Sequence, residues 1–304
     1  MFEIFRVPDE SAEFSEQMGT KFKFWYQDEQ LGLTLFKEGR PGTGENWAEK
    51  ITCELAQILG LPHAQYELAE WRDRAGIISP TFVPNDTRLI HGNELVGGKV
   101  TVASQDTKVR FYHEREHTAS RVFQFLLQSS DYIMRPQNFQ SFSGVGSALD
   151  TFVGYLMFDV WIANQDRHSE NWGVIKHLNN VYLAPTYDHG SSLGRQETDE
   201  RRNSMMTTKD KGASIEAYVR KARSAMYPNS PSNIKPKALL NLDLFIEVKK
   251  IAPVAAAAWL SRLEMISASD IKGIIERIPE SHMSDVARDF THKLLILNQE
   301  RLLN

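Results

Sequence analysis

Two stretches of the sequence decide how the rest is interpreted: Asn164-Gln-Asp-Arg-His-Ser-Glu-Asn-Trp-Gly-Val-Ile175 and Tyr187-Asp-His-Gly-Ser-Ser192. They contain two acids, Asp166 and Asp188, and the amide Asn171, arranged around a short predicted β-hairpin. Carboxylate and amide side chains offer hard oxygen atoms, which suit magnesium. Each residue alone is typical of a polar loop, but their combined spacing favours a functional site.

The predicted hairpin consists of two short apolar runs, 173–176 and 181–184, joined by the turn His177-Leu-Asn-Asn180. Directly before the first acid, residues 149–160 are apolar nearly all round, which predicts a buried central helix. We therefore expect the two acids to follow rigid, buried elements.

The first hundred residues are rich in predicted strands, which lie at residues 21–26, 31–37, 63–71 and 76–83. Asn46 predicts a helix N-cap, with Glu49 as its capping-box partner three residues later. From about Gly97-Gly98 the pattern becomes helical, and helices are predicted at residues 118–128, 239–251, 254–266, 268–278 and 284–303. Residues 195–237 are polar and predict a long loop with one helix.

These patterns predict an α+β fold with two lobes, a small strand-rich lobe at residues 1–98 and a larger helical lobe at residues 99–304. The net charge of −4 favours neither a nucleic-acid nor an anionic-membrane binder. The single cysteine, Cys53, excludes an internal disulfide and fits a reducing cytoplasm. No secretory signal or membrane-spanning stretch is recognised, so a cytoplasmic protein is expected.

Residues upstream of the two acids indicate which chemistry the site could perform. Lys37 ends an apolar strand, where its ammonium can reach nucleotide phosphates, and Glu49 can hold it by a salt bridge. One carboxylate cannot easily be both a cap and a lysine partner, so Glu54 is a second candidate. Asp166 can orient an acceptor hydroxyl, and His168 can add a hydrogen bond or charge to a transferring phosphate.

Five motifs in this order resemble the HipA-like serine/threonine kinases and, more distantly, the protein-kinase-like and phosphoinositide kinases. They run from about residue 18 to residue 195 and are Leu35-Phe-Lys37, Asn46-Trp-Ala-Glu49, Leu55-Ala with Leu59-Gly-Leu-Pro62, Asn164-x-Asp-x-His-x-x-Asn171 and Ala184-Pro-x-Tyr-Asp188. The order and spacing of the five are more specific than any one of them.

The resemblance implies a bilobal protein-kinase-like fold that uses ATP and Mg²⁺ to phosphorylate protein serine or threonine. It implies Lys37 on the ATP phosphates, Asp166 as catalytic base, and Asn171 and Asp188 on magnesium. Ser/Thr protein kinases have lysine where this chain has His168. A further difference is Asp-His-Gly in place of Asp-Phe-Gly, so apolar packing of the middle residue is not assumed.

The nucleotide loop implied by the resemblance, Gln17-Met-Gly-Thr20, contains one glycine, with Gly19 and Thr20 as its candidate nucleotide contacts. Some HipA-like kinases autophosphorylate a serine in this loop, and the nearby hydroxyls here are Ser11, Ser15 and Thr20. Full-length HipA has an extra N-terminal subdomain, so this chain is expected to be a compact relative with a single kinase domain.

HipA-like kinases often act as toxins held by a DNA-binding antitoxin, and some phosphorylate aminoacyl-tRNA synthetases. The partners implied are therefore a protein substrate, such as a translation factor or an aminoacyl-tRNA synthetase, and an antitoxin protein. A few relatives resemble secreted effectors. No direct contact with nucleic acid or membrane is expected.

Other interpretations stay open. A phosphoinositide-like lipid kinase shares the Asp-Arg-His-x-x-Asn pattern, and a non-catalytic nucleotide-binding module is a third class. His113-Glu-Arg-Glu-His117 matches a zinc-protease motif, but its intervening residues are charged and no third ligand is indicated. The polar segment after Asp188 contains three candidate phosphorylation sites, which are Ser204, Thr207 and Thr208.

Overall fold

The computed structural model describes residues 1–14, 22–96, 117–229 and 236–304. The predicted lobe boundary at Gly97-Gly98 and the loop residues Gly19 and Thr20 lie outside these residues. The chain divides into two compact units. Unit 1 comprises Met1–Phe82, Asp188–Tyr218 and Ile266–Leu297, and unit 2 comprises Val83–Tyr187, Val219–Met265 and Asn298–Asn304.

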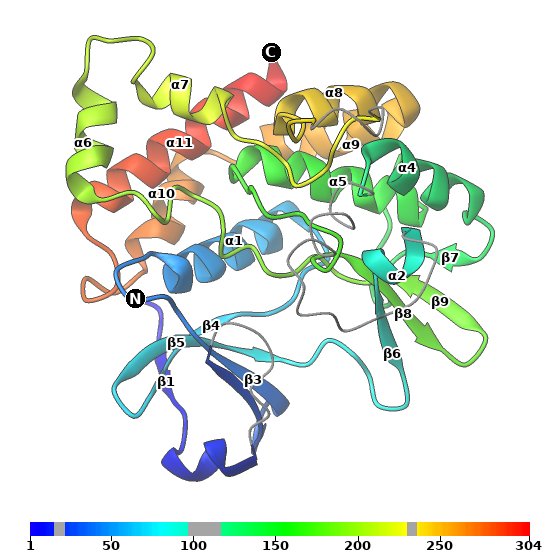
Figure 1. Ribbon diagram of the computed structural model, residues 1–304, viewed down its shortest axis with the longest axis horizontal. Coiled ribbons are helices and arrows are strands. Elements are labelled where there is room, and N and C mark those ends of the chain that lie inside the picture. Colours follow the sequence, from blue (N-terminus) through cyan, green and yellow to red (C-terminus); the bar gives the residue numbers. More distant parts are fainter. Residues whose placement is uncertain (15–21, 97–116, 230–235) are drawn as a thin grey trace. The chain divides into compact units, whose positions relative to one another are not determined.

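Unit 1 contains a five-stranded sheet of order β1-β4-β5-β3-β2, in which β1 runs parallel to β4 and the other neighbours are antiparallel (Figure 1). Its strands are β1 (Ile4–Arg6), β2 (Lys23–Asp28), β3 (Gly32–Glu38), β4 (Glu67–Trp71) and β5 (Arg74–Pro80). Alternate residues of β2 and β3, such as Phe24 and Phe36, are buried in an aromatic core with Trp71. Lys37 is on the other face, because side chains alternate along a strand.

Helix α1 (Glu45–Leu59) packs against β4 and β5, but it does not begin as the sequence predicts. Its N-cap is Gly44 rather than Asn46, since Ala48 N donates to the Gly44 carbonyl at 2.9 Å. A Cβ atom at Gly44 would lie 2.0 Å from the Trp47 ring, so glycine is required where the chain enters the helix. The predicted capping box is therefore wrong, and the Glu49 carboxylate has other partners.

The polar segment after Asp188 folds into two helices, α6 (Asp199–Thr207) and α7 (Ile215–Arg220), rather than the single helix predicted. Helix α6 begins at the N-cap Thr198, whose hydroxyl accepts a hydrogen bond from Arg201 N. Among its side chains only Arg202 and Met205 are buried, which explains its weak apolar periodicity. The predicted helices at 268–278 and 284–303 are present as α10 (Ala268–Glu276) and α11 (Asp285–Leu303).

Unit 2 is built around α5 (Ala148–Trp161), the predicted central helix. Ser147 and Asp150 form a capping box at its start, and apart from Asp150 all its residues are buried. It packs against α8 (Asn241–Ile251) and α9 (Pro253–Glu264). Among the described residues of this unit, α2 (Gly92–Val96) and α4 (Ala119–Gln128) are further helices. None of the described helices is long and apolar enough to cross a bilayer.

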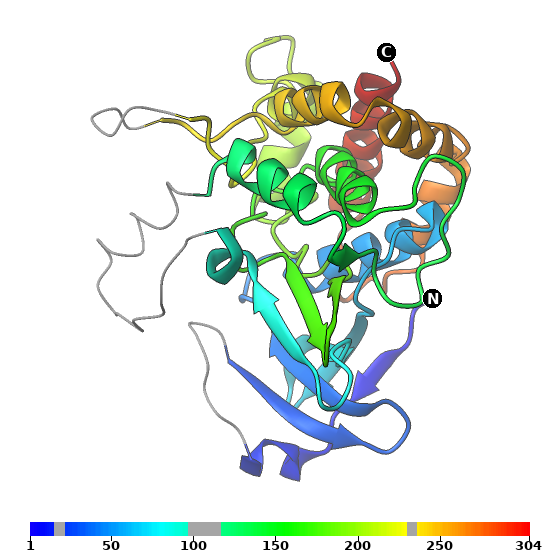
Figure 2. The same cartoon turned by 90° about the vertical axis from the view of Figure 1, so that its right-hand side faces the viewer.

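The predicted hairpin is present in unit 2 as part of a four-stranded sheet of order β6-β8-β9-β7 (Figure 2). Its strands are β6 (Arg88–His91), β7 (Ile133–Met134), β8 (Gly173–His177) and β9 (Asn180–Leu183). The turn residue Leu178 has a left-handed backbone (φ 52°), as a tight hairpin turn requires. Strands β6 and β7 and, in unit 1, β1 were not predicted, because each is too short to show an alternating pattern.

Gly60 and Gly273 differ in the backbone conformation that they adopt, and substitution to alanine tests this difference. Gly60 ends α1 in a left-handed conformation (φ 75°), whereas Gly273 is an exposed residue inside α10 with open space around its Cα. Gly60→Ala should lower the free energy of unfolding by about 1 kcal/mol, because a Cβ disfavours left-handed backbone. Gly273→Ala, the matched control, should raise it by roughly 0.5–1 kcal/mol. Urea unfolding measures both, and a shift of the same sign would contradict the assignment.

Candidate active site

The Lys37 side chain in β3 lies between two carboxylates of unit 1. Its Nζ atom is 3.1 Å from Glu49 Oε1 and 2.7 Å from Asp188 Oδ1. The ion pair expected between Lys37 and Glu49 is thus present, and the structure also brings Asp188 to the same ammonium. Glu54, the second candidate partner, binds Lys50 instead, at 2.7 Å.

Burial and the neighbouring charges shift the pKa values of Lys37 and Glu49. Burial by itself lowers the pKa of Lys37, but the charges of Asp188 and Glu49 outweigh it and raise the pKa above its ordinary value. Burial, which the charge of Asp188 reinforces, raises the pKa of Glu49 to about 7, against the opposing effect of Lys37. The lysine is therefore charged at neutral pH, and its attraction for carboxylates extends to phosphates.

Asp188 itself has a left-handed backbone, with φ of 57°. Such a conformation costs an L-residue about 1–2 kcal/mol and persists where surrounding contacts impose it. Two hydrogen bonds hold it: Asp188 N donates to the Tyr66 hydroxyl at 3.0 Å, and the next amide, His189 N, donates to Glu49 Oε2 at 2.9 Å. A Cβ at Gly190 would lie 3.0 Å from Glu49 Oε1, so glycine permits this approach.

In unit 2 a buried ion pair organises the loop that contains Asp166. Arg167 donates to both carboxylate oxygens of Asp159, from Nε at 2.8 Å and from Nη2 at 2.7 Å. Both residues are almost fully buried. Asp159 also accepts from Asn164 Nδ2 at 2.8 Å, and Asn241 donates to the Asn164 carbonyl at 2.6 Å. The loop is therefore anchored to α5 and α8.

The same loop positions the predicted residues Asp166, His168 and Asn171. Asp166 N donates to Asn164 Oδ1 at 3.1 Å, and its side chain is 45% exposed. His168 Nδ1 accepts from Glu170 N at 3.1 Å, while its Nε2 lies 3.8 Å from Asp166 Oδ1. Asp166 is thus accessible on an internally braced loop, with an imidazole beside it.

The chemistry of the donors fits magnesium. Asn171 Nδ2 donates to the Asp166 carbonyl at 2.7 Å, which leaves Oδ1 as the atom of this amide that can coordinate a cation. The Arg167 guanidinium also donates to the Asn171 carbonyl at 2.9 Å, which fixes the backbone at this point. Asp188 supplies a carboxylate that is 39% exposed. Both are hard oxygen donors of the kind that magnesium binds.

Sequence reasoning missed four residues of these arrangements: Tyr66, Asp159, Arg167 and Asn241. Arg167 lies inside the motif Asn164-x-Asp-x-His-x-x-Asn171 at a position without a predicted role, although an arginine next to a buried helix that carries an acid indicates a buried ion pair. Tyr66 and Asn241 are more than 70 residues from their partners, and no local pattern links them.

The zinc-protease alternative is not supported by the one residue of its motif that the structure describes. His113 and Glu114 lie outside the described residues. His117 is buried, with its Nε2 accepting from Trp172 Nε1 at 3.0 Å and its Nδ1 3.2 Å from the Ala225 carbonyl. Burial lowers its pKa to about 4, which keeps the ring neutral. Both ring nitrogens are engaged within the protein core, so His117 is a structural residue here.

Two other features lie apart from this chemistry. Ser204 and Thr207, candidate phosphorylation sites, are exposed in the structure, and Thr208 is half-buried.

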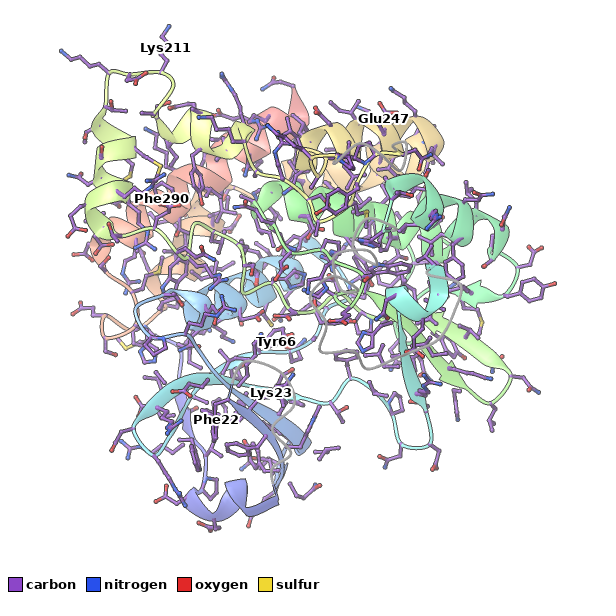
Figure 3. All side chains as sticks on the ribbon, in the orientation of Figure 1. Phe22, Lys23, Tyr66, Lys211, Glu247 and Phe290 are labelled. Carbon is purple, nitrogen blue, oxygen red and sulfur yellow. The ribbon has the colours of Figure 1, made fainter. Side chains whose placement is uncertain are left out.

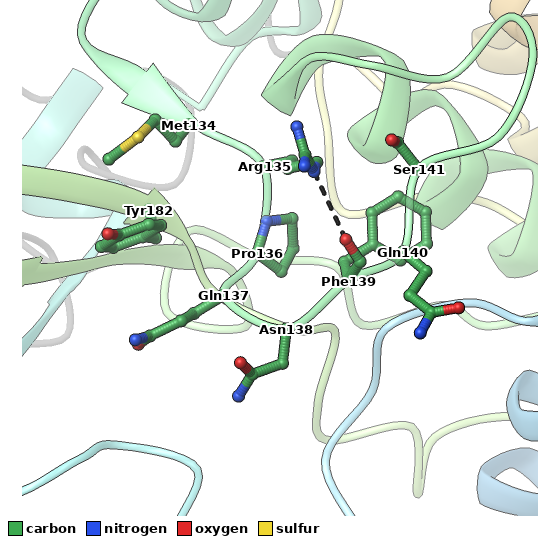
Figure 4. A pocket seen from close by; sticks show the side chains of 9 residues that line it. All are labelled: Met134, Arg135, Pro136, Gln137, Asn138, Phe139, Gln140, Ser141 and Tyr182. Atoms are coloured by element: carbon green, nitrogen blue, oxygen red, sulfur yellow. Dashed lines mark hydrogen bonds between the residues drawn. The ribbon is translucent and has the colours of Figure 1, made fainter.

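Figure 4 shows a hollow in unit 2 in which Arg135 Nε donates to the Phe139 carbonyl at 3.3 Å. The hollow contains none of the predicted site residues and is lined by Met134, Arg135, Pro136, Gln137, Asn138, Phe139, Gln140, Ser141 and Tyr182.

Comparison with protein-family models matches residues 18–240 to the HipA-like C-terminal domain. The chain belongs to this family. The match includes every predicted site residue of this HipA-like protein. A comparison with curated proteins gave no match.

Solved structures agree with the family assignment at the level of the fold. The Helicobacter pylori proinflammatory kinase CtkA is similar over 99% of this chain and 98% of that chain, with a TM-score of 0.66 and 18% identity. A structure of the Shewanella oneidensis MR-1 toxin–antitoxin system HipA, HipB and its operator DNA is similar over 94% of this chain and 64% of that chain, with a TM-score of 0.56 and 14% identity. The predicted α+β kinase-like fold is thereby confirmed.

The buried Asp159–Arg167 pair gives a test of the loop architecture. Asp159→Asn should lower the free energy of unfolding by about 3 kcal/mol, because the Arg167 charge stays buried without its counter-ion. The matched control is Asp131→Asn, the same substitution at an exposed acid, which should change stability by less than about 0.5 kcal/mol. Urea unfolding of the two variants measures the difference. Equal stabilities would show that the pair does not anchor the loop.

Proposed function

We propose that this HipA-like protein is an ATP-dependent kinase that transfers a phosphoryl group to a serine or threonine hydroxyl of a protein. The observation that carries the proposal is the Lys37 ammonium held by Glu49 and Asp188 at 3.1 and 2.7 Å. A charged lysine on a sheet, braced by a helix carboxylate and next to a metal-binding acid, is the arrangement that protein kinases use on ATP.

In the proposed ground state the Lys37 ammonium binds both carboxylates, and nucleotide phosphates compete with them for it. Trp25 and Leu35 support a nucleotide on the same side of the sheet. They are register partners in β2 and β3, and alternation places Leu35 on the Lys37 face. Trp25 is 43% exposed, which is high for a large apolar side chain in a strand. Apolar surface beside a phosphate-binding lysine suits a nucleobase.

The remaining roles follow from the loop in unit 2 and from the segment at Asp188. Asp166 orients the acceptor hydroxyl and accepts its proton at a carboxylate oxygen, and His168 donates to the transferring phosphate. Asn171 and Asp188 hold magnesium through their side-chain oxygens. When bound, this ion neutralises charge on the phosphates. We also propose that Gly19 and Thr20 contact the nucleotide. A further proposal is that the strand-rich lobe ends and the helical lobe begins near residue 98.

The experiment that tests the function is magnesium-dependent transfer of phosphate from labelled ATP to a protein acceptor. Asp166→Ala and Asp188→Ala should each reduce the rate by at least about 100-fold, because a positioned base and a metal ligand are lost. Asp131→Ala, an exposed acid in unit 2, should leave the rate unchanged. Undiminished transfer in both site variants would refute the assignment.

The same assay separates the alternative functions. Phosphatidylinositol vesicles are offered in place of the protein acceptor, and preferential transfer to the lipid would identify a lipid kinase. Binding of ATP without transfer to any acceptor would identify a nucleotide-binding module.

A protein partner is proposed because the similar Shewanella oneidensis structure contains HipA together with HipB. We expect an antitoxin protein that binds this chain and suppresses its phosphate transfer. Affinity purification of the tagged Asp166→Ala variant from its native cell should recover a stoichiometric partner, and adding the purified partner to the wild type should inhibit the transfer. Recovery of no partner, or of one that leaves the rate unchanged, would contradict this expectation.

A further inference from the structure

The backbone of Asp188 needs external support, because its left-handed conformation is unusual for a residue with a side chain. The structure supplies three contacts around it. Lys37 binds the side chain, Tyr66 accepts from the Asp188 amide and Glu49 accepts from the following amide of His189. Two successive N–H groups are therefore held by two acceptors, one on α1 and one in the segment between α1 and β4.

Tyr66 is itself fixed by its neighbours in unit 1. It is the residue before β4 and is buried, and Figure 3 labels it between α1 and the strands of the five-stranded sheet. The next residue, Glu67, binds Lys50 at 2.7 Å, and Lys50 follows Glu49 on α1. The Lys50–Glu67 ion pair thus joins the two chain segments that carry the two acceptors. This contact of the buried Lys50 with the partly exposed Glu67 helps to set the separation of the two segments.

We propose that Tyr66 is a positioning residue for Asp188. The Tyr66 hydroxyl fixes the backbone of this metal-binding acid. The expected effect of Tyr66 on catalysis rests on the proposed function, whereas the hydrogen bond between the Asp188 amide and the Tyr66 hydroxyl does not. Tyr66 touches no phosphate or acceptor in this assignment. It acts through the Asp188 amide alone.

Tyr66 differs from the other two supports in one respect. Lys37 and Glu49 bind each other, so the interactions of both groups change when phosphates bind to the lysine. The Tyr66 hydroxyl is neutral at pH 7, because a phenol titrates only at roughly pH 10. Its hydrogen bond to Asp188 can therefore persist when Lys37 turns to the nucleotide, which is when the position of Asp188 matters most.

The test is the single-atom change Tyr66→Phe, compared with Tyr26→Phe as control. Tyr26 is in the same unit and is 7% exposed, as is Tyr66, but it belongs to the aromatic core of the sheet. In the phosphate-transfer assay Tyr66→Phe should lower kcat about tenfold and raise the magnesium concentration for half-maximal rate about tenfold, with KM for ATP within about twofold of the wild type. Tyr26→Phe should change none of these quantities beyond about twofold.

A second measurement keeps the inference separate from the proposed function. Hydrogen exchange of the Asp188 amide, followed by NMR in the wild type and both variants, should be slow in the wild type and in Tyr26→Phe and at least about tenfold faster in Tyr66→Phe. Wild-type protein that transfers no phosphate would refute the proposed function, and the exchange rates would then decide the positioning role. Unchanged exchange, or unchanged kcat and magnesium dependence in an active enzyme, would overturn the role of Tyr66.

Discussion

The ammonium of Lys37 between Glu49 and Asp188 is the interaction on which unit 1 depends. It joins a strand, a helix and the segment that follows the hairpin, and the two oxygens lie 3.1 and 2.7 Å from one nitrogen. A buried charge is costly unless it is paired, so Lys37 and Glu49 require each other, and the more exposed Asp188 adds a second counter-charge to the ammonium. The pairing explains why Glu49 is not a capping residue and why Glu54 is free to bind Lys50.

Unit 2 also contains a buried ion pair, but this pair fixes a loop. The Asp159–Arg167 pair is buried, and it fixes the loop on which Asp166 is exposed. In both units an inaccessible ion pair or hydrogen bond determines the position of an acid that solvent can reach. Such an arrangement combines a rigid support with a reactive group that can bind ligands, which is a requirement of phosphoryl transfer. In the same way, the Tyr66 hydroxyl is proposed to hold the backbone of Asp188 in addition to packing in the core.

Much of the fold could be predicted because its elements carry local patterns. The helix α5 is apolar nearly all round, the hairpin of β8 and β9 has a recognisable turn, and β2 and β3 are runs rich in apolar residues that a polar turn joins. The failures have specific causes. Strands β1 and β6 span three and four residues and acquire order only by pairing with a neighbour. The start of α1 was misplaced because Gly44 satisfies a steric requirement that Asn46 does not reveal.

The sequence by itself determined the family, the order of the motifs and the candidate residues Lys37, Asp166, Asn171 and Asp188, since these depend on residue type and spacing. Only the tertiary structure decided which carboxylate binds Lys37 and which groups support Asp188. Lys37 and Asp188 are 151 residues apart, and Tyr66 is 122 residues from the amide that it holds. Periodicity extends over one element at a time, whereas a buried charge or amide selects its partner by distance in the folded chain.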